Sequence, residues 1–442
     1  MSLPRGWAST TAAEACTLVQ SGGTPKAGFI DKPGIPFLKV YNIVGQEIDF
    51  DYRPQFVSKN IHQSELKKSI TLPGDVLMNI VGPPLGKVAI VPRTFPEWNA
   101  NQALAIFRPS DAAISRWIYY FLCGGTSVQS VINDTRGSAG QVNISLSQCR
   151  NFELSLPPAA EQRRIVAKLD ALTTRLAHAR AELKRADTLQ RKMRLSALSQ
   201  VFAKHGDGPR ETLDSLCRIG TGSTPKRGDP RYYSGGTIAW VTSGAVNQRL
   251  VDKPTEFITD AAIKETNCKV FPAGSLLVAL YGEGKTRGKV AKLGIAAATN
   301  QALAVLHSFE ERVDPQWISL FLEARYQETR DEAAGGVQPN LNLGIIKAIG
   351  LPVPPLDEQR AAIIRTSLAF SRADRLEAEA ARGRALLDRL ESAILAKAFK
   401  GELVPQDPND EPASVLLDRI RTQRTSVSKA KPKPRSARRI TA

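Results

Sequence analysis

Two copies of one pattern occupy most of this chain. Gly-Gly-Thr-Pro-Lys at 22–26 is answered by Gly-Ser-Thr-Pro-Lys at 222–226, and Asn-Gln-Ala-Leu-Ala occurs at 101–105 and again at 300–304. Further pairs follow in the same order at an offset of about 200 residues, which indicates an internal duplication. Two like units in one polypeptide predict a target with two parts.

Each copy closes with a proline pair and a charged segment. Pro157-Pro158 precedes Glu161-Gln162-Arg163, and Pro354-Pro355 precedes Glu358-Gln359-Arg360. Prolines are tolerated at the first turn of a helix but not inside a strand ladder, and a nearby Glu favours the positive helix end. We therefore predict a first domain at 1–155, a central helix at 156–205, a second domain at 206–352, a second helix at 353–401 and a C-terminal segment at 402–442.

Both charged segments carry an apolar stripe with the spacing of a coiled coil. In the first copy the stripe includes Ile165, Leu169, Leu172, Leu176 and Leu183, and in the second it includes Leu376, Leu387, Leu390 and Ile394. Paired antiparallel, helices of about 40 to 45 residues would form a rod of roughly 60–65 Å that holds the two domains at a fixed distance. The spacing does not distinguish this pairing from association of two chains.

The two globular halves contain short apolar runs broken by Gly and Pro, which predict strands in mixed α/β domains. Trp117–Leu122 and Trp317–Leu322 follow prolines and predict helices that face the cores. The predicted fold class is therefore α+β, with two tandem-repeated domains joined and separated by two long helices.

The chain has a net charge of +17, which favours a polyanionic partner such as DNA. From Arg419 to the end there are nine basic residues and no acidic one. Because Ser, Pro and Lys dominate after Thr425, we expect this tail to be disordered. A phosphate-binding arm and a dispensable extension both fit it.

No apolar run is long enough to span a membrane and no signal peptide begins the chain, so we expect a cytoplasmic protein without a membrane partner. The five cysteines lack the spacing of a metal site or a disulfide framework. The four histidines are likewise dispersed, so we predict no catalytic residue and no metal ligand.

Two catalytic motifs do not fit this sequence. No Pro-Pro pair stands in the Asn/Asp-Pro-Pro-aromatic loop that an amino-methyltransferase needs. Residues 279–286 fit a relaxed phosphate loop, but the first position is Ala279 and the residues after Thr286 predict a strand where a helix is required.

The chain resembles the DNA specificity subunit of type I restriction–modification systems. The likeness rests on the G-x-T-P-K turns, the Pro-Pro/Glu-Gln-Arg helix starts, the Leu3–Trp7 opening and the Ala393–Leu403 segment. It implies two target-recognition domains that each read half of a gapped double-stranded DNA site. It also implies two modification subunits that methylate adenine, together with restriction subunits that cleave. S-adenosylmethionine, ATP and Mg²⁺ would then be bound by those partners, and this chain would need no cofactor.

Residues shared by both halves cannot distinguish two different half-sites, so we expect them to serve the fold or to contact phosphates. They are Lys26, Lys226, Asn101, Gln102, Asn300 and Gln301. Specificity is expected where the halves diverge, at 44–69 against 247–267 and at 124–141 against 325–338. The donors there are Arg53, Lys59, Asn60, His62, Arg136 and Gln141 in the first half and Arg249, Lys253, Lys264, Arg330 and Gln338 in the second.

A competing hypothesis is a scaffold protein in which the coiled coil joins other proteins and the basic tail binds DNA without sequence preference. It predicts a steep salt dependence of DNA binding and no preferred sequence.

Overall fold

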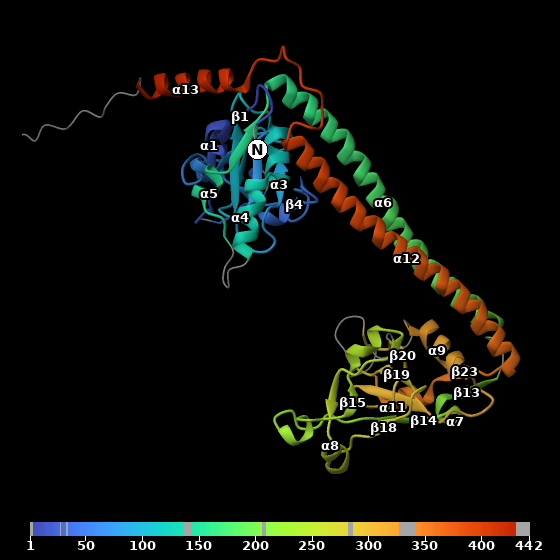
Figure 1. Ribbon diagram of the computed structural model, residues 1–442. Coiled ribbons are helices and arrows are strands. Elements are labelled where there is room, and N and C mark those ends of the chain that lie inside the picture. The colour runs from blue at the N-terminus through green and yellow to red at the C-terminus, as the bar shows by residue number, and fades with distance from the viewer. Residues whose placement is uncertain are drawn as a thin grey trace, which may run out of the picture. The chain divides into compact units, whose positions relative to one another are not determined.

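The computed structural model describes residues 3–26, 28–31, 34–136, 143–205, 209–281, 286–326 and 341–429 (Figure 1). The chain divides into two compact units. The first combines Met1–Ala181 with Arg384–Ala442, and the second is Glu182–Gly383. Each unit contains one globular domain and a segment of each of the two long helices. No helix among the described residues is long and apolar enough to cross a membrane.

The first domain has three main sheets and a small hairpin. Their strand orders are β1-β12, β6-β3-β10-β7, β2-β11-β8-β9 and β4-β5. The strands are β1 (Ala8–Thr11), β2 (Cys16–Ser21), β3 (Ile35–Leu38), β4 (Ile43–Val44), β5 (Glu47–Ile48), β6 (Phe56–Val57), β7 (Ile70–Thr71), β8 (Val76–Asn79), β9 (Val88–Ile90), β10 (Trp98–Ala100), β11 (Leu104–Pro109) and β12 (Glu153–Leu156). The helices are α1 (Ala12–Ala15), η1 (Val40–Asn42), α2 (Lys59–Gln63), η2 (Lys67–Ser69), α3 (Ser115–Gly124), α4 (Thr126–Arg136) and α5 (Leu146–Arg150).

The second domain repeats this plan. Its sheets have the orders β13-β23, β17-β15-β21-β18 and β14-β22-β19-β20-β16. The strands are β13 (Arg210–Thr212), β14 (Arg218–Thr221), β15 (Ile238–Val241), β16 (Leu250–Val251), β17 (Glu256–Ile258), β18 (Val270–Phe271), β19 (Leu276–Ala279), β20 (Val290–Leu293), β21 (Ala297–Thr299), β22 (Leu303–His307) and β23 (Gly350–Pro352). The helices are α7 (Leu213–Leu216), η3 (Pro230–Tyr232), η4 (Ser243–Asn247), α8 (Asp260–Glu265), α9 (Pro315–Ala324) and α11 (Leu343–Ala348).

The register of the sheets confirms the duplication predicted from sequence. β10 pairs parallel with β3, and β21 pairs parallel with β15. β11 pairs antiparallel with β2, with Ala105 opposite Ser21, and β22 pairs antiparallel with β14, with Ala304 opposite Thr221. The repeated sequence motifs therefore lie at the same end of the same strand pair in each domain.

The aromatic helices face the cores, as predicted. Trp117 on α3 and Trp317 on α9 are both fully buried. Each contacts a phenylalanine near the end of a long helix, with ring centroids 5.1 Å apart for Trp117 and Phe399 and 4.8 Å apart for Trp317 and Phe202. Burial of these large rings joins the end of a helix to the core of its own domain.

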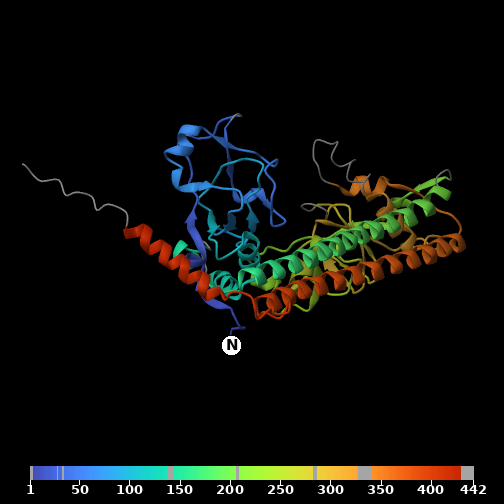
Figure 2. The same cartoon turned by 90° about the horizontal axis from the view of Figure 1, so that it is seen from above.

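The two long helices are α6 (Ala159–Lys204) and α12 (Leu356–Phe399). Within each unit they lie side by side and antiparallel (Figures 1 and 2). Arg180 forms an ion pair with Asp388 at 2.7 Å in the first unit, and Arg194 forms one with Asp374 in the second. The helices thus pair within one chain, as the antiparallel prediction requires.

The predicted stripe on α6 is buried or half-buried: Ile165 and Leu169 lie in the core of the first domain, and Leu183 lies against Gly383 of α12. Leu172 and Leu176 are half-buried and buried. On α12, the prediction for Leu390 is wrong. Its side chain is 50% exposed, and Glu391 takes the facing position, where it pairs with Arg180 at 2.7 Å. The other predicted stripe residues of α12, which are Leu376, Leu387 and Ile394, are half-buried.

The N-terminal segment contacts the turn after α12 in the first unit. Gly401 follows α12 with a φ of +73°, and a side chain there would come 2.6 Å from Pro4 and 3.2 Å from Trp7. The indole of Trp7 in turn packs edge-on against Trp117 with centroids 6.0 Å apart. The core of the first domain therefore receives Phe399 from the end of α12, far along the sequence. The core of the second domain receives Phe202 from α6, the helix that directly precedes it.

The expected disorder of the basic tail, which begins at Arg419, is wrong for its first part, because Arg419–Lys429 belong to a helix, α13 (Ala413–Lys429), that packs on the first domain. Ala413, Leu417 and Ile420 are buried in the domain core. Arg421 pairs with Glu14 at 3.0 Å, and Arg424 donates to the carbonyl of Cys16 at 2.7 Å. Residues 430–442 lie outside the described part of the chain.

Candidate nucleic-acid interface

The two motifs that recur in both halves meet in space. In the first domain, the turn after β2 packs against the turn between β10 and β11, and the hydroxyl of Thr24 donates to Gln102 Oε1. In the second domain, Thr224 makes the same bond with Gln301 Oε1 at 2.6 Å. Motifs almost 80 residues apart in each half therefore form one local structure.

Close backbone contact explains the glycines of this structure. The Gly22 N–H donates to Leu104 O at 2.9 Å, and a Cβ at Gly22 would lie 2.0 Å from the carbonyl oxygen of Ala100. At Gly222 the corresponding distance to Thr299 O is 1.8 Å. Only glycine permits such an approach.

The paired asparagines serve the fold. Asn101 Oδ1 accepts the Ala103 N–H at 3.2 Å, and Asn300 Oδ1 accepts the Ala302 N–H at 3.3 Å. Their backbone N–H groups continue the parallel strand pairs, donating to Leu38 O at 2.9 Å and to Val241 O at 3.0 Å. In contrast, the side chains of Gln102 and Gln301 are exposed.

The ends of the divergent segments lie beside this structure. In the first domain, Glu65 Oε1 accepts the backbone N–H of Lys26 at 2.7 Å, and Gln20 Nε2 donates to the Lys68 carbonyl at 2.9 Å. In the second domain, the Ser223 carbonyl accepts hydrogen bonds from Trp240 Nε1 and from Cys268 Sγ, both at 3.2 Å, and Cys268 directly follows the divergent segment 247–267. Each domain therefore brings a shared turn structure next to a segment that differs between the halves.

Lys26 and Lys226 are exposed, and further basic residues border them. In the first domain these are Lys67 and Lys68 on η2, and in the second they are Arg227 and Lys269. These neighbours, like Thr24 and Thr224, were absent from the candidates drawn from sequence. The threonine shared by the two G-x-T-P-K turns was the available signal, but its partner lies in a different part of the sequence.

Several specificity candidates remain accessible. Arg53 lies in a loop at a φ of +53° with its guanidinium over the ring of Tyr52, and Lys59 and Asn60 begin α2. Lys253 follows β16, and Lys264 lies on α8. All five side chains are exposed.

The prediction for His62 does not hold in this structure, because the ring is only 1% exposed. His62 Nδ1 lies 2.7 Å from Asn99 Oδ1, and Nε2 lies 3.0 Å from Glu97 Oε2. Asn99 also donates to Leu66 O and Ser69 Oγ, both at 3.2 Å. His62 therefore fastens α2 to the sheet and has no ring nitrogen left for a base.

Arg249 is also engaged within the protein. Its guanidinium forms an ion pair with Glu323 at 2.5 Å and lies 4.2 Å from the ring centroid of Phe370 on α12. These contacts link the second domain to its helix, and base contact would require both to break.

The other divergent segments are only partly described. Gln141, Arg330 and Gln338 lie outside the described residues, and Arg136 is the last residue of α4, where its side chain is not described. The body of α4 is packed on the domain through Val128 and Ile132.

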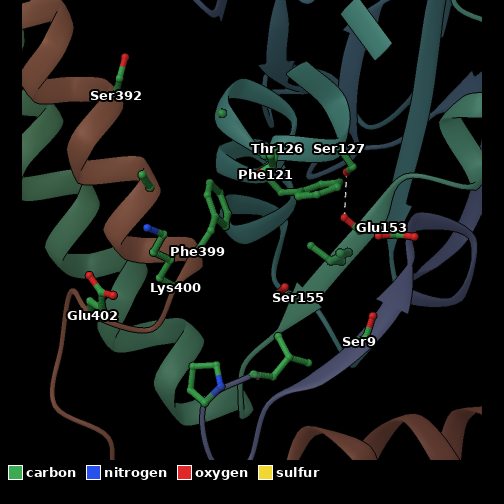
Figure 3. A pocket seen from close by; sticks show the side chains of 16 residues that line it. Ser9, Phe121, Thr126, Ser127, Glu153, Ser155, Ser392, Phe399, Lys400 and Glu402 are labelled. Carbon is green, nitrogen blue, oxygen red and sulfur yellow. Dashed lines mark hydrogen bonds between the residues drawn. The ribbon is translucent and has the colours of Figure 1, made fainter. Parts of the chain in front are cut away.

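The structure holds a pocket away from the turn motifs. Its volume is about 910 Å³, and it lies in the first unit between α4, β12 and the end of α12 (Figure 3). Ser127 donates to the Glu153 carbonyl at 2.9 Å across its wall, and Lys400 and Glu402 border it near Phe399. None of the predicted DNA-binding residues lines it.

Residues 279–286, which fit a relaxed phosphate-loop pattern, are followed by strand β20, as predicted. The helix that a phosphate loop needs therefore does not follow them. Burial raises the pKa of the Cys16, Cys123, Cys149 and Cys217 thiols to about 12, which disfavours the reactive thiolate. Among the described residues, no group of three or more His, Cys, Asp and Glu could hold a metal ion.

Comparisons with known proteins identify the same two repeated domains. The family model "Type I restriction modification DNA specificity domain" matches residues 4–185 and 211–368. The StySPI specificity subunit of Salmonella potsdam is 24% identical over 96% of each chain, and the EcoKI specificity subunit of Escherichia coli K12 is 22% identical over 96% of this chain and 97% of that one.

Two solved structures share the fold. A chain from a study of complex assembly in the type I restriction–modification system aligns with a TM-score of 0.75 at 22% identity, covering 91% of this chain and 100% of that chain. The HsdS subunit from Thermoanaerobacter tengcongensis aligns with a TM-score of 0.54 at 21% identity over 91% and 99% of the two chains. With two matched copies that span most of its length, this chain belongs to the type I restriction modification DNA specificity domain family.

Proposed function

We propose that this chain is the DNA-reading subunit of a type I restriction–modification complex. Each globular domain reads one half of a bipartite gapped site in double-stranded DNA, and the paired helices set the length of the gap. The observation that carries this proposal is the repetition of one surface in two domains. The Thr–Gln turn structure is the same in both, while the segments at 44–69 and 247–267 beside it differ.

Two linked domains bind DNA more tightly than either domain alone. Once one domain is bound, the helices hold the second near its own half-site, which raises the effective concentration of the second contact. Specificity then comes from side chains that reach base edges, and the exposed candidates Arg53, Lys59, Asn60, Lys253 and Lys264 are the first to consider.

Partner subunits perform the chemistry in this proposal. Two modification subunits dock on the long helices and methylate adenine, and restriction subunits cleave. S-adenosylmethionine, ATP and Mg²⁺ belong to those partners. Exposed aliphatic side chains on the helices support docking there: Leu189, Leu195, Ile364, Leu368, Leu386 and Leu390, which are each 50–63% exposed.

Long-read sequencing that detects base modification tests this function directly. Genomic DNA of the source strain is compared with DNA from a strain that lacks this gene. We expect a gapped motif with methyladenine on both strands in the first and its loss in the second. Unchanged methylation, together with failure of the chain to co-purify with a methyltransferase, would instead favour a scaffold that binds DNA without sequence preference.

A further inference from the structure

We propose that the Thr–Gln pair and the lysine that follows it form a phosphate clamp in each domain, which grips the DNA backbone next to the half-site. The clamp consists of Thr24, Gln102 and Lys26 in the first domain and of Thr224, Gln301 and Lys226 in the second. This inference deepens the proposed function and rests on it. It assigns these six residues to positioning on the backbone and not to reading of bases.

The first argument is that the fold does not require the exposed pair. Close backbone contact at Gly22 holds the two turns together, and a part-buried hydrogen bond from Asn101 shapes one of them; Gly222 and Asn300 do the same in the second domain. A hydrogen bond between exposed side chains adds little stability in water. Yet the Thr–Gln bond is present in both copies, although the segments beside it have diverged.

The second argument is chemical. Because the threonine hydroxyl donates to Gln Oε1, the amide is oriented with its Nε2 donors away from the threonine. Among the described residues, no protein group accepts from Nε2 of Gln102 or Gln301. An oriented amide donor is suited to a phosphate oxygen, and the exposed lysine two residues after its threonine partner adds a positive charge to the same turn.

The third argument is the local charge. Lys26, Lys67 and Lys68 are exposed around the first clamp, and no described residue forms an ion pair with any of the three. Glu65 is the nearby acid, and its carboxylate accepts the backbone N–H of Lys26.

The second clamp is bordered by Lys226, Lys269 and Arg227, of which Arg227 is paired with Glu256 at 2.5 Å. Both sites therefore keep unpaired ammonium groups. Groups that are identical in the two domains cannot distinguish different half-sites, whereas the sugar–phosphate backbone is common to both.

Binding of the full-length chain to DNA tests the clamp. The probes are a duplex that carries the methylated motif and the same duplex with both half-sites scrambled, each titrated over a range of KCl concentrations. The variants are Gln102→Ala with Gln301→Ala, and Lys26→Ala with Lys226→Ala. Gln200→Ala with Lys192→Ala, both exposed on α6, is the matched control.

The two variants have different expected signatures. The glutamine variant should bind both duplexes about tenfold more weakly with the salt slope unchanged, because an amide displaces no counterion. The lysine variant should bind both duplexes more weakly and to the same extent, and its plot of log K against log salt should be less steep by about 2, close to 0.9 for each lost phosphate contact. The control should match the wild type.

Threonine variants test the positioning role. Thr24→Val with Thr224→Val should reproduce the glutamine variant, and Thr24→Ser with Thr224→Ser should restore binding. The unfolding midpoint should be unchanged in every case. Loss of affinity for the target duplex alone would overturn the proposal, because the glutamines would then read bases. Unchanged affinity for both duplexes would overturn it as well.

Failure of the clamp and failure of the proposed function are distinguishable. If the wild-type chain does not prefer any duplex, the proposed function fails. The clamp is still tested in that case on the scrambled duplex, where a phosphate contact must show the same losses.

Discussion

Gln359 Oε1 accepts the backbone N–H of Asp314 at 2.9 Å, which ties the first turn of α12 to the residue that caps α9. The amide nitrogen of the same side chain donates to Arg312 O at 2.9 Å and to Pro354 O at 2.7 Å. Gln162 makes the matching three bonds, with Ile114 N, Ala112 O and Pro157 O. The glutamine of each Glu-Gln-Arg motif thus fixes a long helix to its domain.

Replacement of this glutamine by leucine should destabilise the protein. Gln162 and Gln359 are almost fully buried, so Gln359→Leu leaves one backbone N–H and two carbonyls without partners, at a cost of about 1–3 kcal/mol for each unsatisfied group. Urea unfolding monitored by circular dichroism measures the change. Gln200→Leu on the exposed face of α6 is the matched control and should change the free energy of unfolding little. Equal effects of the two variants would contradict the anchoring role.

Gly383 lets the two long helices approach closely in the second unit. A methyl group there would lie 3.1 Å from Leu183 Cδ2, at the flexible end of that side chain. We expect Gly383→Ala to change stability little, since a helix-propensity gain of about 1 kcal/mol offsets the crowding. In a Leu183→Ala background the crowding is absent, so the same change should stabilise by about 1 kcal/mol. A double-mutant cycle measures this coupling, and its absence would show that the two positions do not touch.

Docking of α13 should weaken in acid. The hydrogen bond from Arg421, and then that from Thr10, lowers the pKa of Glu14. A depressed folded-state pKa contributes stability above the unfolded value, and that contribution is lost as pH falls through the folded value. Glu14→Gln should therefore speed hydrogen exchange in α13 at neutral pH, after correction for intrinsic rates. Below the lowered folded-state pKa of Glu14 the two proteins should match. A difference that persisted there would exclude the ionised carboxylate as its cause.

Exchange of residues 44–69 for the segment of a relative should change the first half-site and leave the second intact. The exchanged segment must keep His62, Leu66 and Ser69, because these residues bind Asn99 and support the fold. Mapping of methylated adenines measures both half-sites together. The reciprocal exchange at 247–267 is the control and should change only the second half-site. An unchanged first half-site after the first exchange would show that residues 44–69 do not determine the sequence of that half-site.

Sequence reasoning succeeded where the determinants are local. The starts of α6 and α12 and most of the apolar stripe depend on residues within a few turns of one another, and the repeat is visible because the two copies share short motifs in the same order. Leu390 failed because the facing positions on α12 shift to Leu387, Glu391 and Ile394, and a salt bridge replaces an apolar contact. The small stripe Ala413, Leu417 and Ile420 had helical spacing, but the basic composition of the tail concealed it.

Nonlocal contacts were not predictable from one sequence. A buried and an exposed histidine look alike in sequence, and only the β10 register places Asn99 under His62. Thr24 and Gln102 meet because β2 and β11 are neighbours, which spacing alone does not specify. The contact between Gly401 and Pro4 joins the N-terminal segment to the turn after α12, and no local sequence pattern predicts it.

Lengthening both long helices should lengthen the gap between the half-sites. Insertion of one heptad after Ala181 in α6 and another after Arg382 in α12 preserves the phase of the apolar stripe. Seven residues add about 10 Å at 1.5 Å each, up to about three base pairs at 3.4 Å. Methylation mapping should then report a longer gap between two unchanged half-sites. An insertion in α6 alone shifts pairs such as Arg194 with Asp374 out of register and should instead reduce stability and methylation. An unchanged gap in the double-insertion variant would mean that the length of the helices does not determine the gap between the half-sites.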